Sequence, residues 1–131
     1  MPSIFSRIIA GEIPCYKVAE NETCFAFMDI SPLAIGHVLV VPKTEVDKYF
    51  DLSDAELSEI NLFAKKIAVA IEKVITCKRV GVAVIGLEVS HAHIHLIPLN
   101  SVEDINFERE KLNLSGEKLA EVAELISGAV R

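Results

Sequence analysis

The sequence predicts an α+β domain in which an antiparallel sheet of about five strands packs against two main helices. Short, strand-like apolar runs alternate with two segments whose apolar residues recur at helical spacing. The chain has 131 residues, of which 51% are hydrophobic, and this length suits one compact domain. We therefore expect a single domain over 1–131, with a core at about 4–108 and a C-terminal helix at about 115–128.

The first half of the chain predicts one short helix and three strands. Ser3 can cap a helix over 4–10, and Gly11 ends it. Strand-like runs follow at 16–20, 23–30 and 37–43, and Phe25 and Phe27 fall on one face of the second run. We expect these three strands to pair consecutively and antiparallel.

The second half opens with the clearest helical signal, over 54–75. Ser53 and Glu56 form a capping box, and apolar residues then recur at helical spacing. Two β-branched and aliphatic runs, 80–89, which is broken at Gly86, and 92–99, which ends near Pro98, are expected to pair as the central, best-buried strands. Ser115 can cap the last helix, whose apolar stripe consists of Leu119, Val122, Ala123 and Ile126.

Charge and hydropathy exclude several classes of function. Thirteen Lys and Arg against 19 Asp and Glu give a net charge of −6, which disfavours a nucleic acid polymer as partner. The longest apolar runs, 38–41 and 82–87, are far shorter than the roughly 20 residues of a membrane helix, so we expect no membrane span. The N-terminus lacks a secretory signal and the three cysteines form no paired motif, which favours a cytoplasmic location with reduced thiols.

Three of the four histidines are clustered in the segment His91-Ala92-His93-Ile94-His95. Successive side chains of a strand point to opposite faces, so Ala92 and Ile94 are expected in the core and the three histidines on the other face. A single histidine in a strand is usually structural, but three in alternation are not explained in that way. The pattern predicts a row of three imidazoles.

Two kinds of chemistry remain open for this row. At about 3.3 Å per residue, the Cα atoms of His91 and His95 are ~13 Å apart. One zinc ion, which needs nitrogens at about 2.0 to 2.1 Å, therefore requires further ligands such as His37 or Asp29. A neutral imidazole attacking phosphorus, with neighbouring imidazoles donating hydrogen bonds, fits the row better. Mutual repulsion of positive charge is expected to lower the pKa most at the middle ring, His93.

The segment His91-Ala92-His93-Ile94-His95-Leu96-Ile97 resembles the alternating signature of the histidine triad (HIT) family of nucleotide-binding proteins and hydrolases. Segments 4–14, 26–32 and 36–43 also resemble family segments, in the family's order. The resemblance implies a homodimer whose sheet continues across the dimer axis, with an AMP- or GMP-like purine nucleotide bound beside the triad.

The resemblance also implies roles for individual residues. His93 is the expected nucleophile that forms a nucleotidyl-histidine intermediate, and His37, His91 and His95 are expected to orient it and to contact the phosphate or leaving group. Asp29 matches the aspartate that binds the ribose hydroxyls, although a turn cap ahead of Ser31 is an alternative role. The apolar wall around the base is expected to consist of Ile4, Phe5, Ile8, Phe27, Met28 and Ile30.

Two departures from the family pattern qualify these expectations. Ser3, Ser6 and Glu45 stand where many members have zinc ligands, so no structural zinc or other cofactor is expected. The stretch before the triad is short and apolar, and Glu88 adds negative charge, whereas Val89 and Ser90 can supply phosphate contacts.

The function predicted is a nucleotidyl hydrolase or transferase that acts on nucleoside phosphoramidates or dinucleoside polyphosphates. A weakly catalytic nucleotide-binding module and a metal-dependent protein are the alternatives.

Overall fold

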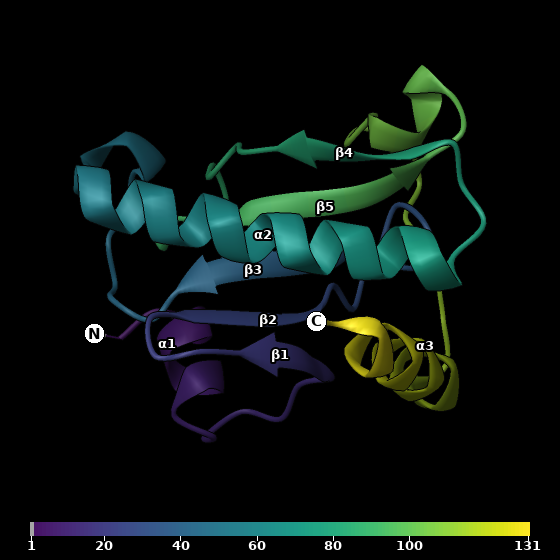
Figure 1. Ribbon diagram of the computed structural model, residues 1–131. Helices are drawn as coiled ribbons and strands as arrows, with labels where there is room; N and C mark the ends of the chain where they lie inside the picture. The colour runs from purple at the N-terminus through teal and green to yellow at the C-terminus, as the bar shows by residue number, and fades with distance from the viewer. Residues whose placement is uncertain (1) are drawn as a thin grey trace.

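Five antiparallel strands form one sheet in the order β1-β2-β3-β5-β4 (Figure 1). The structure is a computed structural model that describes residues 2–131. The predicted α+β class with a five-stranded antiparallel sheet is confirmed. No helix within the described residues is both long enough and apolar enough to span a membrane. The strands are β1 (Lys17–Glu20), β2 (Cys24–Met28), β3 (Val38–Pro42), β4 (Arg79–Ala83) and β5 (Ile94–Leu99).

Local capping signals fix where the helices begin. The Ser3 hydroxyl accepts a hydrogen bond from the Ser6 amide at the start of α1 (Ile4–Ile9). Ser53 and Glu56 form the predicted capping box at the start of α2 (Asp54–Val74). Ser115 caps α3 (Gly116–Ala129). The three predicted helices are therefore confirmed to within about one residue at each end. Short 3-10 turns, η1 (Tyr49–Asp51) and η2 (Val102–Ile105), complete the elements.

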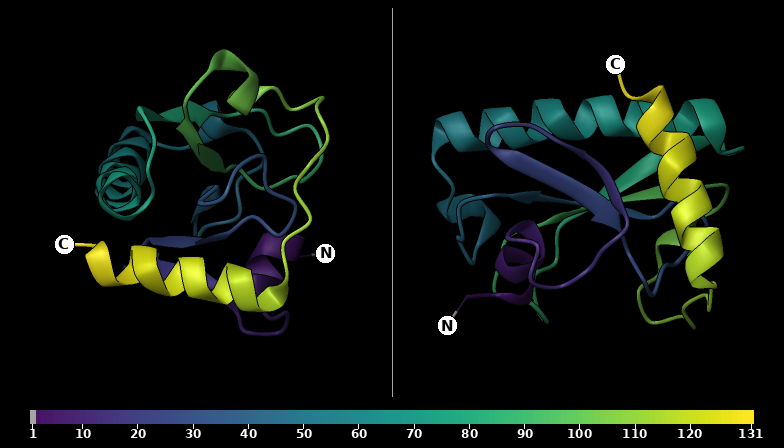
Figure 2. Two further views of the ribbon diagram at one scale, coloured as in Figure 1. Left: turned by 90° about the vertical axis from the view of Figure 1, so that its right-hand side faces the viewer. Right: turned by 90° about the horizontal axis from the view of Figure 1, so that it is seen from below.

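The helices cover the two faces of the sheet unequally. In Figures 1 and 2, α2 crosses one face and α3 packs beside it, while α1 lies on the opposite face. We call these the α2 face and the α1 face. Alternate strand residues divide between them: Ala26 and Val40 pack under α2, whereas Phe27 and Leu39 pack with Phe5 of α1. The large core thus lies on the α2 face, and the α1 face holds a smaller cluster.

The two strands expected at the centre of the sheet differ from that expectation. β4 ends at Ala83 instead of residue 89 and forms an edge of the sheet, because among residues 2–131 it pairs with β5 alone. Gly86 has φ +70°, a left-handed conformation that breaks the extended run. β5 begins at Ile94, so His91 and His93 precede the strand instead of lying within it. Only His95 belongs to the sheet itself.

Candidate active site

The four histidines meet on the α1 face of the sheet. His95 lies in β5 opposite Leu39 of β3, and His37 immediately precedes β3. The ring centroids of His93 and His95 are 5.0 Å apart, and those of His37 and His95 are 5.2 Å apart. All four side chains are buried, but His93 and His95 keep 7% and 8% exposure, whereas His37 and His91 keep 1% and 0%. His93 and His95 are therefore the two that a ligand can reach.

Backbone groups fix the proton positions of His37 and His95. The Leu33 amide donates to Nδ1 of His37 at 3.0 Å, so this nitrogen carries no proton. In the neutral ring, Nε2 of His37 therefore carries the proton, and it donates to Nδ1 of His95 at 3.0 Å. By the same logic the proton of neutral His95 is on Nε2. His95 can thus donate one hydrogen bond to a bound ligand.

His93 has the opposite arrangement. Its Nδ1 lies 2.7 Å from the carbonyl oxygen of His91, which only accepts hydrogen bonds, so Nδ1 carries the proton. The Nε2 nitrogen of neutral His93 is left with a free lone pair. The ring is also held by an edge contact with Phe5, at 5.0 Å between centroids. The site therefore presents a free lone pair on His93 beside an N–H donor on His95.

His91 is turned away from this pair, which corrects part of the expected role. Its Nε2 donates to the carbonyl oxygen of Pro42 at 2.8 Å, and its Nδ1 accepts from the Ser3 hydroxyl at 2.7 Å. Both nitrogens of His37 are likewise engaged, by Leu33 and His95. His37 and His91 are therefore arranged to orient the site, and neither has a ring nitrogen free for a phosphate or leaving group.

The positions that correspond to family zinc ligands come together without a zinc donor set. Ser3 contacts His91, and the Ser6 hydroxyl donates to the Glu45 carboxylate at 2.6 Å. The Ser3 amide donates to the same carboxylate oxygen at 2.7 Å, and these bonds lower the pKa of Glu45. Zinc prefers thiolate, imidazole and carboxylate ligands over hydroxyl groups, so this group of residues does not fit a structural zinc. Hydrogen bonds join α1 to the triad instead.

Burial lowers the pKa values of the histidines in the site. The pKa of His37 falls to about 3 and that of His95 to about 4, chiefly because burial disfavours the charged ring, with repulsion from a neighbouring histidine second. The pKa of His93 is also lowered by burial. The expectation that the pKa falls most at the middle ring was wrong, because within the triad the larger fall is at His95 and its leading cause is burial. All three rings are neutral at pH 7.

Asp29 both caps a turn and borders the site. Its Oδ1 accepts from the Ser31 amide at 2.8 Å, which is the turn-cap role. Its Oδ2 lies 3.5 Å from Nε2 of His37. Burial raises the pKa of Asp29, while the Ser31 amide and the charge of Lys111 oppose this rise. The second oxygen remains available as an acceptor for a ligand hydroxyl.

The site also contains three side chains close enough together to hold a metal ion. One ligand atom from each of Asp29, His37 and His95 lies within 4.8 Å of the others. A metal on Nε2 of His37 would force the ring proton onto Nδ1. There it would face the donating amide of Leu33. The local hydrogen bonds therefore disfavour metal binding at these three residues.

Comparison with known proteins identifies the family. The chain matches the HIT domain over residues 10–102. It belongs to the HIT family. It is 36% identical to an uncharacterized HIT-like protein of Borreliella burgdorferi, over 95% of each chain, and 34% identical to the adenosine 5′-monophosphoramidase hnt1 of Schizosaccharomyces pombe, over 100% of each chain. Among solved structures, the Hit-like protein of Bartonella henselae, crystallised with an unknown ligand, superposes with a TM-score of 0.84 at 31% identity, covering 97% of this chain and 95% of that one.

The residues expected to form the nucleotide wall of this HIT protein are only partly brought together. Phe5, Phe27, Ile8 and Val89 form or border the apolar cluster of the α1 face. Met28 does not, because the alternation of β2 places it in the core of the α2 face at 1% exposure. Ile4 and Ile30 are 49% and 68% exposed, and Ser90 is exposed, so none of the three is packed into the cluster.

The structure adds residues that the HIT motif does not include. Phe107 lies edge-on to His95, with ring centroids 4.7 Å apart, and also contacts His37. Lys111 is close enough for its charge to lower the pKa of both Asp29 and His37. Both residues follow the end of the family match at residue 102. They lie in a polar stretch without periodicity, where the only available signal was a single aromatic residue among charges.

Proposed function

We propose that this HIT protein is a nucleotidyl hydrolase or transferase that acts at the α-phosphate of a purine nucleoside phosphoramidate or dinucleoside polyphosphate. The lone pair of His93 Nε2 forms a bond to the α-phosphorus, and the bond from phosphorus to the leaving group breaks. The leaving group takes its proton from water. A second water then attacks phosphorus and gives its proton to the hydroxide left by the first, the electron pair of the phosphorus–nitrogen bond returns to Nε2, and the nucleoside monophosphate is released.

One observation carries this proposal: the opposite tautomers of His93 and His95. His93 holds its proton on the side of the His91 carbonyl and offers a lone pair, while His95 offers an N–H to the charge that develops on a phosphoryl oxygen. Burial keeps both rings neutral at pH 7, the state in which His93 is a nucleophile. The phosphoramidase name of the fission yeast relative supports the same reaction class.

The remaining nucleotide contacts follow from the same arrangement. We assign the ribose hydroxyls to the free Oδ2 of Asp29, and the purine to the apolar surface formed by Phe5, Phe27 and Ile8. Val89 and Ser90, in the loop after β4, are assigned to the phosphate. Adenine and guanine both suit an apolar wall of this kind.

The reaction class is tested by trapping the intermediate. The protein is mixed with an adenosine phosphoramidate, quenched in base, under which phosphohistidine bonds persist, and its intact mass is measured. We expect an added adenylyl group that peptide mapping locates on His93. His95→Gln keeps the nucleophile and serves as a control that retains the adduct at a lower rate. Turnover without an adduct, or an adduct on another residue, would exclude covalent catalysis by His93.

A nucleotide-binding module with weak catalysis is the second candidate. Glu88 lies close enough to raise the pKa of His93 by its charge, and the same charge opposes an anionic substrate. Glu88→Gln is therefore expected to raise kcat/KM for the phosphoramidate. AMP binding by calorimetry, with no turnover in either wild type or Glu88→Gln, would favour the binding module.

We also propose a homodimer joined through β4. This edge strand presents unpaired backbone together with the apolar side chain of Val82, which is 62% exposed. Leu87, in the loop after the strand, is 88% exposed. Such an edge invites pairing with a second strand, and a second copy of β4 continues the sheet across a two-fold axis.

The compartment that we propose is the cytoplasm. Cys15, Cys24 and Cys77 are free thiols in the structure, and Cys24 is buried in the core. Reduced, packed thiols suit a reducing compartment.

A further inference from the structure

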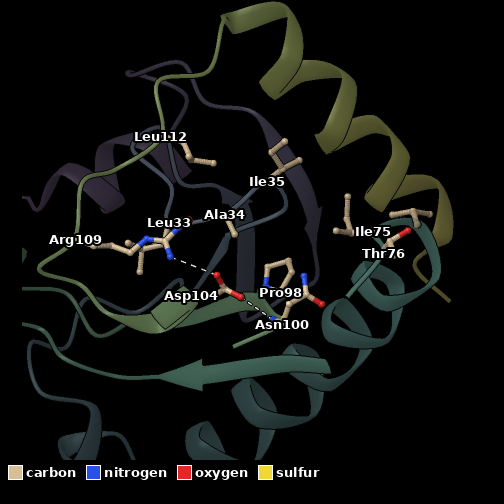
Figure 3. A pocket seen from close by; sticks show the side chains of 11 residues that line it. Leu33, Ala34, Ile35, Ile75, Thr76, Pro98, Asn100, Asp104, Arg109 and Leu112 are labelled. Atoms are coloured by element: carbon tan, nitrogen blue, oxygen red, sulfur yellow. Dashed lines mark hydrogen bonds and ion pairs between the residues drawn. The ribbon is translucent and has the colours of Figure 1, made fainter. Parts of the chain in front are cut away.

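Residues 101–112 run from the end of β5 back toward the histidines, and we call this segment the strap. The amides of Asn100 and Ser101 donate to Oδ2 of Asp104, at 2.7 and 2.9 Å. Arg109 then donates to Oδ1 of Asp104 at 3.3 Å and to the carbonyl oxygen of Glu103 at 2.9 Å. Figure 3 shows Arg109 and Asp104 beside a pocket of about 410 Å³ whose lining includes none of the four histidines. Hydrogen bonds from Arg109 to Glu103 and Asp104 therefore hold the two ends of the strap together.

The strap is fastened to the loop that precedes His37. The second guanidinium nitrogen of Arg109 donates to the carbonyl oxygen of Leu33 at 3.0 Å. The Leu112 amide donates to the carbonyl oxygen of Pro32 at 2.8 Å. These two contacts hold adjacent peptide units of one short loop, so they restrict both the position and the rotation of the Leu33 peptide groups.

Leu33 connects the strap to the proton positions of the site. Its carbonyl oxygen accepts from Arg109, while its amide donates to Nδ1 of His37. That amide is the group that places the proton of His37 on Nε2 and consequently the proton of His95 on Nε2. Hydrogen bonds therefore lead from the C-terminal end of β5, through Asp104, Arg109 and Leu33, to His37 and back to His95 in the same strand.

Phe107 gives the strap a second contact with the same pair. Its ring lies edge-on to His95 at 4.7 Å and to His37 at 6.3 Å. An aromatic edge in this position excludes water from the His37–His95 hydrogen bond and restricts rotation of the His95 ring.

We propose that the strap is a positioning device of the active site, so that His95 keeps its N–H directed at the substrate. The Leu112 amide and Arg109 hold the two peptide units on either side of Leu33, and Phe107 shields the imidazole pair. The expected loss of kcat rests on the proposed reaction. The expected tautomer of His95 does not, because it can be measured in the ligand-free protein. Arg109 and Phe107 are positioning residues, since they act on the substrate through His37 and His95.

The direct test is the tautomer of His95, read from ¹⁵N chemical shifts of its two ring nitrogens by long-range ¹H–¹⁵N correlation at pH 7. In the wild type we expect Nε2 protonated and Nδ1 bare. In Arg109→Met, which keeps the aliphatic stem but loses the hydrogen bonds, we expect mixed tautomers. Arg109→Lys can restore one bond to Leu33 and is expected to lie between the two. A wild-type tautomer in Arg109→Met would overturn the inference.

Kinetics supply the second readout. Arg109→Met and Phe107→Leu are expected to lower kcat by about 10- to 100-fold, with KM changed less than about twofold, because the affected group is misplaced and not removed. Lys118→Met and Phe50→Leu are matched controls on the surface, and Phe50 is 85% exposed. Equal losses in the controls, or a loss confined to KM, would contradict a positioning role.

Two further measurements separate this inference from its neighbours. Asp104→Asn should lower kcat as much as Arg109→Met does. The double variant should lose no more kcat than either single variant, because both residues act through the same series of hydrogen bonds to Leu33. Additive losses of kcat would show that the two residues act independently. If the wild type forms no adduct on His93, the proposed reaction fails, but the tautomer measurement on ligand-free protein still tests the strap.

Discussion

The two faces of the sheet are filled in different ways. Under α2 and α3, the interior is apolar, with side chains such as Ile67 and Ile94 fully buried. On the α1 face, four buried imidazoles share a smaller space with Phe5, Phe27 and Leu39. Alternation along β5 serves both at once, since Ile94 and Leu96 point to the α2 face and His95 points to the other.

This difference indicates how so small a chain can bury four histidines. A buried histidine costs stability because its charged form is disfavoured and its nitrogens need partners. Here each engaged ring nitrogen has a hydrogen-bond partner, and the apolar α2 face supplies the compensating stability. The partners are the Ser3 hydroxyl, the Leu33 amide, the carbonyl oxygens of Pro42 and His91, and, between His37 and His95, the other ring. Changes on the α1 face should therefore alter chemistry first, and changes on the α2 face should alter stability first.

The largest effect is expected from His93→Ala, on the α1 face. The substitution removes the nitrogen that we propose attacks phosphorus, so turnover of an adenosine phosphoramidate should fall by several orders of magnitude. Because His93 is only 7% exposed and packs against Phe5, the melting temperature should also fall, so activity is compared at a temperature where the variant remains folded. Enzyme from a host lacking the endogenous phosphoramidase is required for the assay. A variant with a tenth of wild-type activity would contradict the covalent mechanism.

The opposite result is expected from Ile67→Ala, on the α2 face. Ile67 is a fully buried residue of α2, so the truncation should lower the free energy of unfolding by about 2 to 5 kcal/mol, as measured by urea denaturation. At a temperature where the variant remains folded, kcat should stay within about twofold of the wild type. A large fall in kcat without loss of stability would mean that the two faces are not separable.

A substitution at the β4 edge tests whether the sheet pairs with that of a second copy of the chain. Val82→Asp places one charge on each side of an isologous interface, so sedimentation should show monomer or insoluble protein. Lys78→Asp, just before β4, changes charge outside the apolar run and is the control. A wild type that sediments as monomer at tens of micromolar contradicts the dimer, and a fully dimeric Val82→Asp places the interface elsewhere.

Sequence alone predicted those features whose causes are local. The α2 capping box depends on Ser53 and Glu56, three residues apart, and it was found exactly where the motif lies. The alternation of Ala92, Ile94 and Leu96 correctly placed these three in the large core. Local rules suffice here because the partners are within one turn or one strand.

Features that depend on distant partners were missed or misplaced. The extent of β4 depends on which strand pairs beside it, and the strand ends at Ala83, where its pairing with β5 ends. The orientation of His91 depends on Ser3, 88 residues away in sequence. Arg109 and Phe107 lie in a polar segment whose role is apparent only when it is folded against Leu33 and His95. Periodicity carries no information about such contacts.

Acid should weaken the α1 face selectively. The pKa of His37 is about 3 and that of His95 about 4 in the folded protein, against an ordinary value of 6.5. Below pH 6.5 the unfolded chain therefore binds more protons at these sites, and stability should fall as the pH drops from about 6.5 toward 4. The raised pKa of Asp29 acts in the opposite direction.

The comparison of wild type with His95→Gln isolates this effect. Melting temperatures are measured from pH 7 to pH 4, and the fall in the variant should be shallower because one of the two histidines with strongly lowered pKa values is absent. Asp29 and the surface carboxylates contribute equally to both proteins. Parallel curves would show that His95 titrates normally in the folded state.

The smallest effect is expected from removing metal. Ser3, Ser6 and Glu45 hold α1 against His91 by hydrogen bonds, so EDTA should change neither the melting temperature nor turnover. The bonds themselves should matter more: Ser3→Ala removes both a helix cap and the partner of a buried imidazole nitrogen, at a cost of about 1 to 3 kcal/mol. The triple variant Ser3→Cys, Ser6→Cys, Glu45→His supplies thiolates and an imidazole beside His91, and it should bind one zinc and become sensitive to EDTA. Sensitivity of the wild type itself, or one equivalent of tightly held zinc in it, would contradict the hydrogen-bonded arrangement.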